Sequence, residues 1–110
     1  ANLDKTQLIR VVTNLVKNAL QAVEGEENPV IDVTVLSEKN NIKIIVSDNG
    51  KGIPEDVKDL IFEPKFTTKT SGMGLGLGMI KNIIEAYEGR ISFTSKEGIG
   101  TIFTVILPKE

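Results

Sequence analysis

Four glycines stand at every second position of one short stretch (Gly72, Gly74, Gly76 and Gly78), and an apolar run with helical spacing follows them over residues 79–87. Glycine weakens the interior of a helix, so stability alone does not favour four of them here. A glycine-rich loop that opens into a helix presents unpaired backbone N–H groups and the positive end of the helix dipole, and both suit a phosphate. The stretch therefore predicts a loop that leads into a helix and binds a nucleotide.

Composition excludes several other kinds of site. The chain has 110 residues, a net charge of −2 and no run of Lys or Arg, which argues against nucleic-acid binding. It contains no cysteine, hence no disulfide and no thiolate metal site, and no histidine, hence no phosphoacceptor imidazole of its own. We expect one domain, 1–110, that is the C-terminal part of a longer protein. No membrane-length apolar run is seen, which is compatible with the cytoplasm even if the parent protein is membrane-anchored.

Hydrophobic periodicity predicts the order α-β-β-α-loop-α-β-β. Asp4 is the expected N-cap of the first helix. Helices are expected at residues 5–23, 55–61 and from the glycines to about 88, strands at 30–36, 42–48, 91–95 and 101–107, and a mobile loop at 64–74. The fold class is therefore α+β: a two-layer α/β sandwich whose mostly antiparallel or mixed sheet, of about four strands, carries three helices on one face.

Three carboxamides share one face of the first predicted helix. Asn14 and Asn18 are four residues apart, and Gln21 lies close to the same face. This face is roughly 140° from the centre of the apolar stripe, so we expect it beside the core and not in it. The stripe consists of Leu8, Val12, Leu15, Ala19 and Val23. A solvated polar face is the plainer interpretation. The alternative is a ligand site, because Asn is a poor helix former and its amide oxygen suits Mg²⁺ beside phosphates.

Asp48 ends the second predicted strand in phase with the apolar residues Ile44 and Val46. Its carboxylate is therefore expected on the core side, where it needs hydrogen-bond donors. One interpretation is an Asx turn that caps the bend after it. The other is an acceptor for a ligand amine such as that of adenine, with Gly50 and Gly52 allowing a flat base to come close.

Two other groups of residues leave alternatives open. Phe62 and Phe66 fit plain core positions, and Lys65 and Lys69 either reach phosphates or are exposed.

Two common phosphate-binding motifs are absent from the sequence. The P-loop motif is absent because no glycine is followed by Lys and then Ser or Thr, and the glycines do not fit G-x-G-x-x-G either.

Taken together and in this order, these segments resemble the catalytic and ATP-binding domain of bacterial sensor histidine kinases, within the GHKL superfamily, and most of all its nitrogen-regulation-type branch. The likeness covers nearly the whole chain. The matching segments are 14–19 (N box), 48–53 (G1 box), 62–66 (F box), 72–77 (G2 box) and 98–103 (the closing glycine-threonine segment).

The resemblance implies an α/β sandwich that holds ATP between its helices and a lid at about 64–74. Asn18 would ligate Mg²⁺ and Asn14 would line the phosphates, so these two are the catalytic candidates. Asp48 would accept from the adenine amine. The implied nucleotide contacts are Asp48, Gly50, Gly52, Phe62, Lys65, Phe66, Lys69, Gly72, Gly74, Leu75, Gly76, Leu77 and Thr101.

One position bears on the type of reaction. The gyrase, chaperone and mismatch-repair branches place a glutamate that activates water where this chain has Asn14, and an amide cannot take that proton. The resemblance thus implies a histidine kinase domain that gives the γ-phosphoryl group of ATP to a histidine on a separate dimeric helical domain, with a response regulator downstream. A GHKL-type ATPase and a non-catalytic docking module are the alternatives. Gln21 and Ala22 depart from the Lys-Tyr of many relatives, and the strands that usually precede the first helix are missing.

Overall fold

The computed structural model describes residues 4–62 and 77–108. Its elements are α1 (Lys5–Ala22), β1 (Ile31–Ser37), β2 (Asn41–Asp48), the 3-10 helix η1 (Glu55–Leu60), α2 (Leu77–Ala86), β3 (Arg90–Lys96) and β4 (Gly100–Pro108). The order and types of the elements agree with the sequence prediction, except that the second helix is a 3-10 helix. The predicted loop at 64–74 lies outside the described residues.

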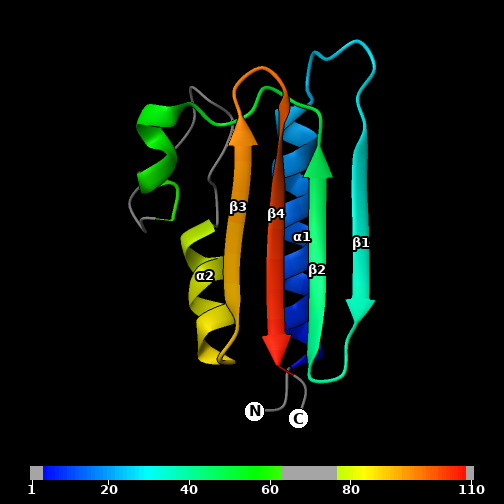
Figure 1. Cartoon of the computed structure of the whole chain (residues 1–110), viewed down its shortest axis with the longest axis vertical. Helices are drawn as coiled ribbons and strands as arrows, with labels where there is room; N and C mark the ends of the chain where they lie inside the picture. The colour runs from blue at the N-terminus through cyan, green and yellow to red at the C-terminus, as the bar shows by residue number, and fades with distance from the viewer. Residues whose placement is uncertain (1–3, 63–76, 109–110) are drawn as a thin grey trace.

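The four strands form one sheet in the order β1-β2-β4-β3, and every neighbouring pair is antiparallel. Both α-helices lie on one face of this sheet, α1 against β2 and β4 and α2 against β3 (Figure 1). The two-layer α+β fold expected from the sequence is confirmed. Of the three helices expected, the described residues contain two α-helices and the 3-10 helix η1.

The core lies between the helices and the sheet. Residues of α1, α2, β2 and β4 fill it at alternating strand positions and helical spacings, which explains both sequence periodicities. Its most buried side chains include Val11, Leu15, Ile44, Val46, Leu77, Ile80, Ile84 and Val105. Asp4 caps α1 as expected, because its carboxylate accepts a hydrogen bond from the Thr6 N–H at 2.9 Å.

Glu88 takes the left-handed conformation after α2, with φ of 63°. Gly89, which follows it, is needed for space, since an added Cβ would lie 2.7 Å from Leu107 Cδ2 and 3.1 Å from Ile84 Cγ2. None of the helices within residues 4–62 and 77–108 is long and apolar enough to cross a bilayer.

Candidate functional site

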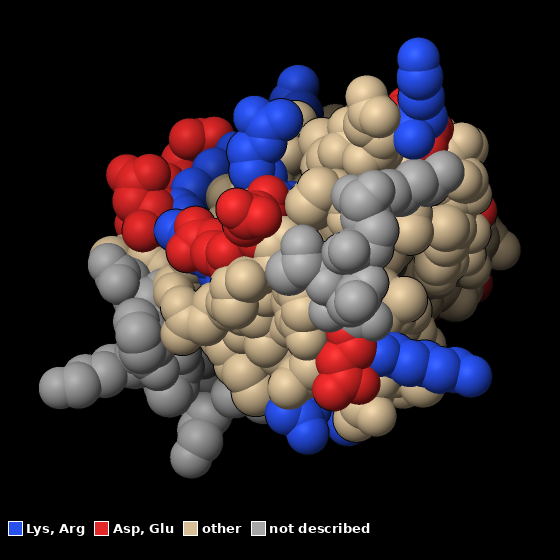
Figure 2. Space-filling model, turned by 90° about the horizontal axis from the view of Figure 1, so that it is seen from below, with Lys and Arg blue, Asp and Glu red and all other residues tan. Residues whose placement is uncertain are grey.

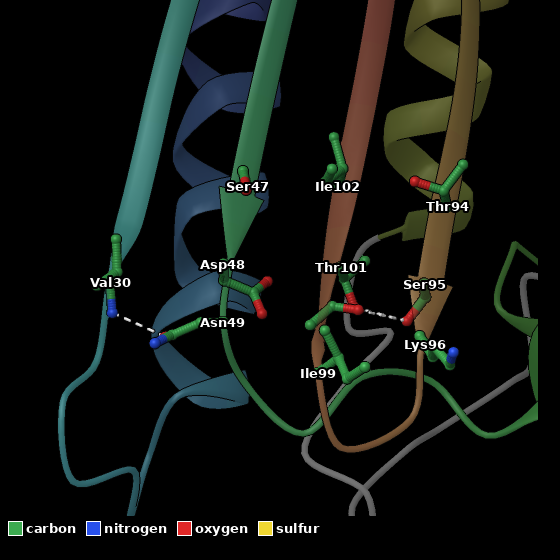
Figure 3. Close-up of a pocket in the computed structure, with 11 residues that line it drawn as sticks. Val30, Ser47, Asp48, Asn49, Thr94, Ser95, Lys96, Ile99, Thr101 and Ile102 are labelled. Atoms are coloured by element: carbon green, nitrogen blue, oxygen red, sulfur yellow. Dashed lines mark hydrogen bonds between the residues drawn. The ribbon is translucent and has the colours of Figure 1, made fainter.

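Three polar residues form a row across the end of the sheet. Asp48 of β2 is paired with Thr101 of β4, which is paired in turn with Ser95 of β3. The next row toward the middle of the sheet is Val46, Phe103 and Phe93, which belong to or pack against the core. The polar row therefore faces the helical layer, at the place where the apolar core stops (Figure 3).

Asp48 is a buried carboxylate, 8% exposed. Its Oδ1 accepts a hydrogen bond from the Gly50 N–H at 2.8 Å. Burial raises the pKa of this carboxyl above its ordinary value of 3.8, while the backbone N–H groups of Gly50 and Thr101 favour the ionised form and oppose the rise. The Asx turn expected after Asp48 is confirmed. The turn uses only part of the acceptor capacity of the carboxylate, so a ligand amine remains compatible with it.

The turn after Asp48 packs between the end of α1 and the β3–β4 hairpin. Gly50 lies against the end of α1, where an added Cβ would overlap the carbonyl group of Ala22, and the Lys51 N–H donates to the Ala22 oxygen at 3.0 Å. Gly52, with φ of +75°, lies against the β3–β4 hairpin, and an added Cβ there would approach Glu97 Cα to 2.9 Å. These glycines therefore let the turn pack against protein backbone. A contact with a base at either glycine remains a prediction.

Ser95 was not a candidate from the sequence, although it belongs to the site. Its Oγ accepts from the Ile53 N–H at 2.8 Å, lies 2.8 Å from Thr101 Oγ1 and donates to the Gly100 oxygen at 3.0 Å. The hydroxyl thus ties the turn after Asp48 to Thr101. One signal could have identified it, because Ser95 occupies a core-facing position in a strand that otherwise alternates Ile91 and Phe93 with polar residues.

The carboxamides of α1 are deeper than expected. Asn18 is 2% exposed, so its predicted place beside the core was wrong. Asn14 is half-buried and its Nδ2 donates to the Arg10 carbonyl oxygen at 3.0 Å, and Gln21 is half-buried too. Within the described part of the chain, three buried amide atoms have no hydrogen-bond partner: Gln7 Oε1, Asn18 Nδ2 and Gln21 Oε1. Gln7 lies near the start of α1, but Asn18 and Gln21 lie near its end, which contacts the turn after Asp48, and a ligand there would complete their hydrogen bonds.

This arrangement limits the kind of metal site. In residues 4–62 and 77–108 no group of three or more Asp, Glu, His or Cys side chains converges to hold an ion. The Asn18 amide, turned by 180°, would offer a buried neutral oxygen, which suits Mg²⁺ that takes its remaining ligands from phosphates and water. The residues present therefore fit a magnesium ion that arrives with a nucleotide.

The other predicted contacts have mixed outcomes. Phe62 packs edge-on against Phe93, with 5.8 Å between ring centroids, and Lys81 Nζ lies 5.5 Å from the Phe62 centroid, so Phe62 is at least a core residue. Leu77, the first residue of α2, is fully buried. Seven contacts lie outside the described residues and stay predictions: Lys65, Phe66, Lys69, Gly72, Gly74, Leu75 and Gly76.

A hollow of about 430 Å³ lies at the same end of the sheet. Ser47, Thr94 and Ile102, which alternate with the polar row, line it together with Asp48, Ser95 and Thr101 (Figure 3). The hollow therefore shares residues with the polar row. Figure 2 views the molecule from the opposite end of the sheet, where Asp and Glu side chains lie next to Lys and Arg.

Comparisons with known proteins bear on the family and the fold. Residues 3–110 match the family model of histidine kinase-, DNA gyrase B-, and HSP90-like ATPases. The chain is 46% identical to the sensor histidine kinase ZraS of Escherichia coli (strain K12) over 105 residues, and 38% identical to a putative sensor histidine kinase NtrY-like of Rickettsia conorii over 102 residues. These matches cover 96% and 93% of this chain but only 22% and 17% of those proteins.

Solved structures give the same result for the fold. The nucleotide-free catalytic domain of the histidine kinase ThkA superposes with a TM-score of 0.82 at 39% identity, over 96% of this chain and 68% of that one. A mycobacterial sensor histidine kinase, MprB, superposes with a TM-score of 0.76 at 23% identity, which speaks for the fold alone.

Proposed function

Because the chain belongs to the family of histidine kinase-, DNA gyrase B-, and HSP90-like ATPases, and resembles its sensor histidine kinases, we propose that it binds ATP with Mg²⁺ and donates the γ-phosphoryl group to a histidine of another domain. The chain has no histidine, so the acceptor has to lie outside these 110 residues. A dimeric helical domain of the parent kinase is the proposed acceptor, and the receiver domain of a response regulator the next recipient.

The buried carboxylate of Asp48 is the observation on which this proposal rests. A carboxylate at the edge of a core is unfavourable unless donors surround it, and the fold supplies two backbone N–H groups. Its remaining acceptor capacity suits the exocyclic amine of adenine, and Thr101 lies directly opposite it in the sheet. We therefore propose that the adenine lies on the helix side of the polar row.

Phosphoryl transfer mainly requires positioning and charge neutralisation. Asn18 would hold Mg²⁺, which neutralises charge on the phosphates, and Asn14 would lie along them. The N-terminus of α2 and the glycines before it would give backbone N–H groups to the phosphates. Asn14 carries an amide and cannot accept a proton from water at neutral pH, which favours transfer to a histidine over hydrolysis. Because the reaction would use ATP, we propose that it takes place in the cytoplasm.

A transfer assay tests the proposal. The chain is mixed with the histidine-bearing helical dimer of a related sensor kinase, Mg²⁺ and [γ-³²P]ATP, and label on the dimer is followed. Label that is acid-labile and alkali-stable is expected. Steady release of free phosphate without label on the dimer would instead favour an ATPase, and no nucleotide-dependent signal at all would favour a docking module.

A matched pair of variants ties the result to the site. Asp48→Ala removes the buried carboxylate, and we expect transfer at low ATP to fall roughly tenfold to a hundredfold, the range for a hydrogen bond to a charged group. Asp32→Ala removes an exposed carboxylate of β1 and should leave transfer unchanged. Equal activity of the two variants would remove Asp48 from the nucleotide site.

A further inference from the structure

The Ser95 hydroxyl has three neighbours, which is as many as a hydroxyl can satisfy. It has one proton to donate and two lone pairs that accept. The Ile53 N–H is a donor and occupies one lone pair, at 2.8 Å. The Gly100 carbonyl oxygen can only accept, at 3.0 Å, so it takes the Ser95 proton. The remaining neighbour is Thr101 Oγ1, at 2.8 Å (Figure 3).

This arrangement fixes the direction of the last hydrogen bond. With its own proton directed to Gly100, Ser95 can meet Thr101 only as an acceptor. The Thr101 hydroxyl must therefore donate to Ser95, and its proton is no longer free for any other partner. Toward Asp48 and a ligand, Thr101 can then only accept.

We infer that Ser95 is a positioning residue that holds the Thr101 hydroxyl as an acceptor and thereby selects a 6-aminopurine over a 6-oxopurine. This inference rests on the proposed nucleotide site. Asp48 and Thr101 are directly opposite in the β2–β4 register, so their Cβ atoms are about 5 Å apart. The base would meet two acceptors side by side.

Two natural bases differ in the relevant atoms. Adenine carries an amine at position 6, which donates to both acceptors. Hypoxanthine carries a carbonyl oxygen at the same position, which would face a carboxylate and a hydroxyl with no proton to give. If Ser95 loses its hydroxyl, Thr101 regains a free proton that can be donated to the carbonyl, so discrimination between the two bases should weaken.

The test compares the dissociation constants of ATP and ITP, each with Mg²⁺, by titration calorimetry on the 110-residue chain. We expect Ser95→Ala to lower the ITP-to-ATP ratio of dissociation constants about tenfold, the effect of roughly one hydrogen bond. Ser95→Thr keeps the hydroxyl and should keep the wild-type ratio. Ser92→Ala makes the same change on the exposed face of β3 and should also leave the ratio unchanged.

The two dissociation constants distinguish failure of the Ser95 role from failure of the proposed function. A wild-type ratio in Ser95→Ala, with ATP still bound, would overturn the role of Ser95 and leave the proposed function intact. If wild type binds neither nucleotide, the proposed function fails and the inference fails with it. Should Ser95→Ala not fold, Thr101→Val tests the same polarity: weaker ATP binding with unchanged ITP binding supports an accepting Thr101, and weaker ITP binding alone would overturn it.

Discussion

Replacing Asn18 with alanine tests whether this buried amide serves a ligand or the fold. Leu15 provides the comparison, because it lies one turn earlier on α1 and is also buried, at 0% exposed against 2% for Asn18. The two truncations remove side chains of similar size from the same helix. They differ in what the side chain does before it is removed.

The structure sets the expected magnitudes. Leu15 belongs to the apolar core, so Leu15→Ala should lower the free energy of unfolding by about 2–5 kcal/mol. Asn18 Nδ2 is buried without a partner among the described residues, and such an atom costs about 1–3 kcal/mol. Its removal offsets most of the packing that is lost. We therefore expect Asn18→Ala to cost under about 1 kcal/mol without nucleotide.

Urea unfolding with and without ATP and Mg²⁺ measures both properties. A ligand at 100 times its dissociation constant raises the free energy of unfolding by about 2.7 kcal/mol. Wild type and Leu15→Ala should gain that amount at their own saturation, and Asn18→Ala should lose most of it at the same ligand concentration. If Asn18→Ala costs as much as Leu15→Ala, or keeps the full gain from ligand, the reasoning is refuted.

Three further predictions concern the turn and its supports. Burial raises the pKa of Asp48 in the folded chain, so the wild type loses stability as pH rises from 3.8 through this folded pKa. The free energy of unfolding of Asp48→Asn, relative to that of wild type, should therefore increase with pH over this window. A decrease of this difference in urea melts would contradict the prediction. Gly50→Ala must displace the turn from the end of α1 and should lower the free energy of unfolding by about 2–4 kcal/mol. Gly98 has φ of +83° and open space around it, so Gly98→Ala should lower it by about 1 kcal/mol. Equal losses would contradict the close packing of Gly50 against α1. Lys58 Nζ donates to the Ser95 carbonyl oxygen of β3 at 2.7 Å, so Lys58→Met should lower the free energy of unfolding by about 1 kcal/mol. Glu55 is its exposed ion-pair partner, so Glu55→Gln should lower it by under about 0.5 kcal/mol. Thermal melts that reverse this order would contradict the prediction.

The sequence predicted the fold because its two periodicities were clean. Alternation placed Asp48 on the core side. Helical spacing predicted an apolar stripe of Leu8, Val12, Leu15, Ala19 and Val23, and the buried face of α1 is Val11, Leu15, Asn18, Ala19 and Ala22, so the helix was predicted but its buried face is rotated from the predicted one. The short helix after Pro54 was predicted without its type, since six residues are too few for periodicity to distinguish a 3-10 helix from an α-helix.

Asn18 was misplaced because the predicted apolar stripe was centred on the wrong side of α1. Val11, Leu15 and Ala22 lie within about 60° of Asn18 around the helix, and all four are buried, so Asn18 lies on the core-facing side. Ser95 was missed for a different reason, because its importance comes from Ile53 and Thr101, which are distant in sequence or on another strand.

The position of the base is the most direct test of the central claim. A crystal structure of the chain with a nonhydrolysable ATP analogue and Mg²⁺ should show adenine on the helix side of the sheet, with its amine toward Asp48 and the ion at the Asn18 amide. A base on the opposite face of the sheet, beside Ser47 and Ile102, or a helix-side cleft closed by protein side chains, would contradict the account.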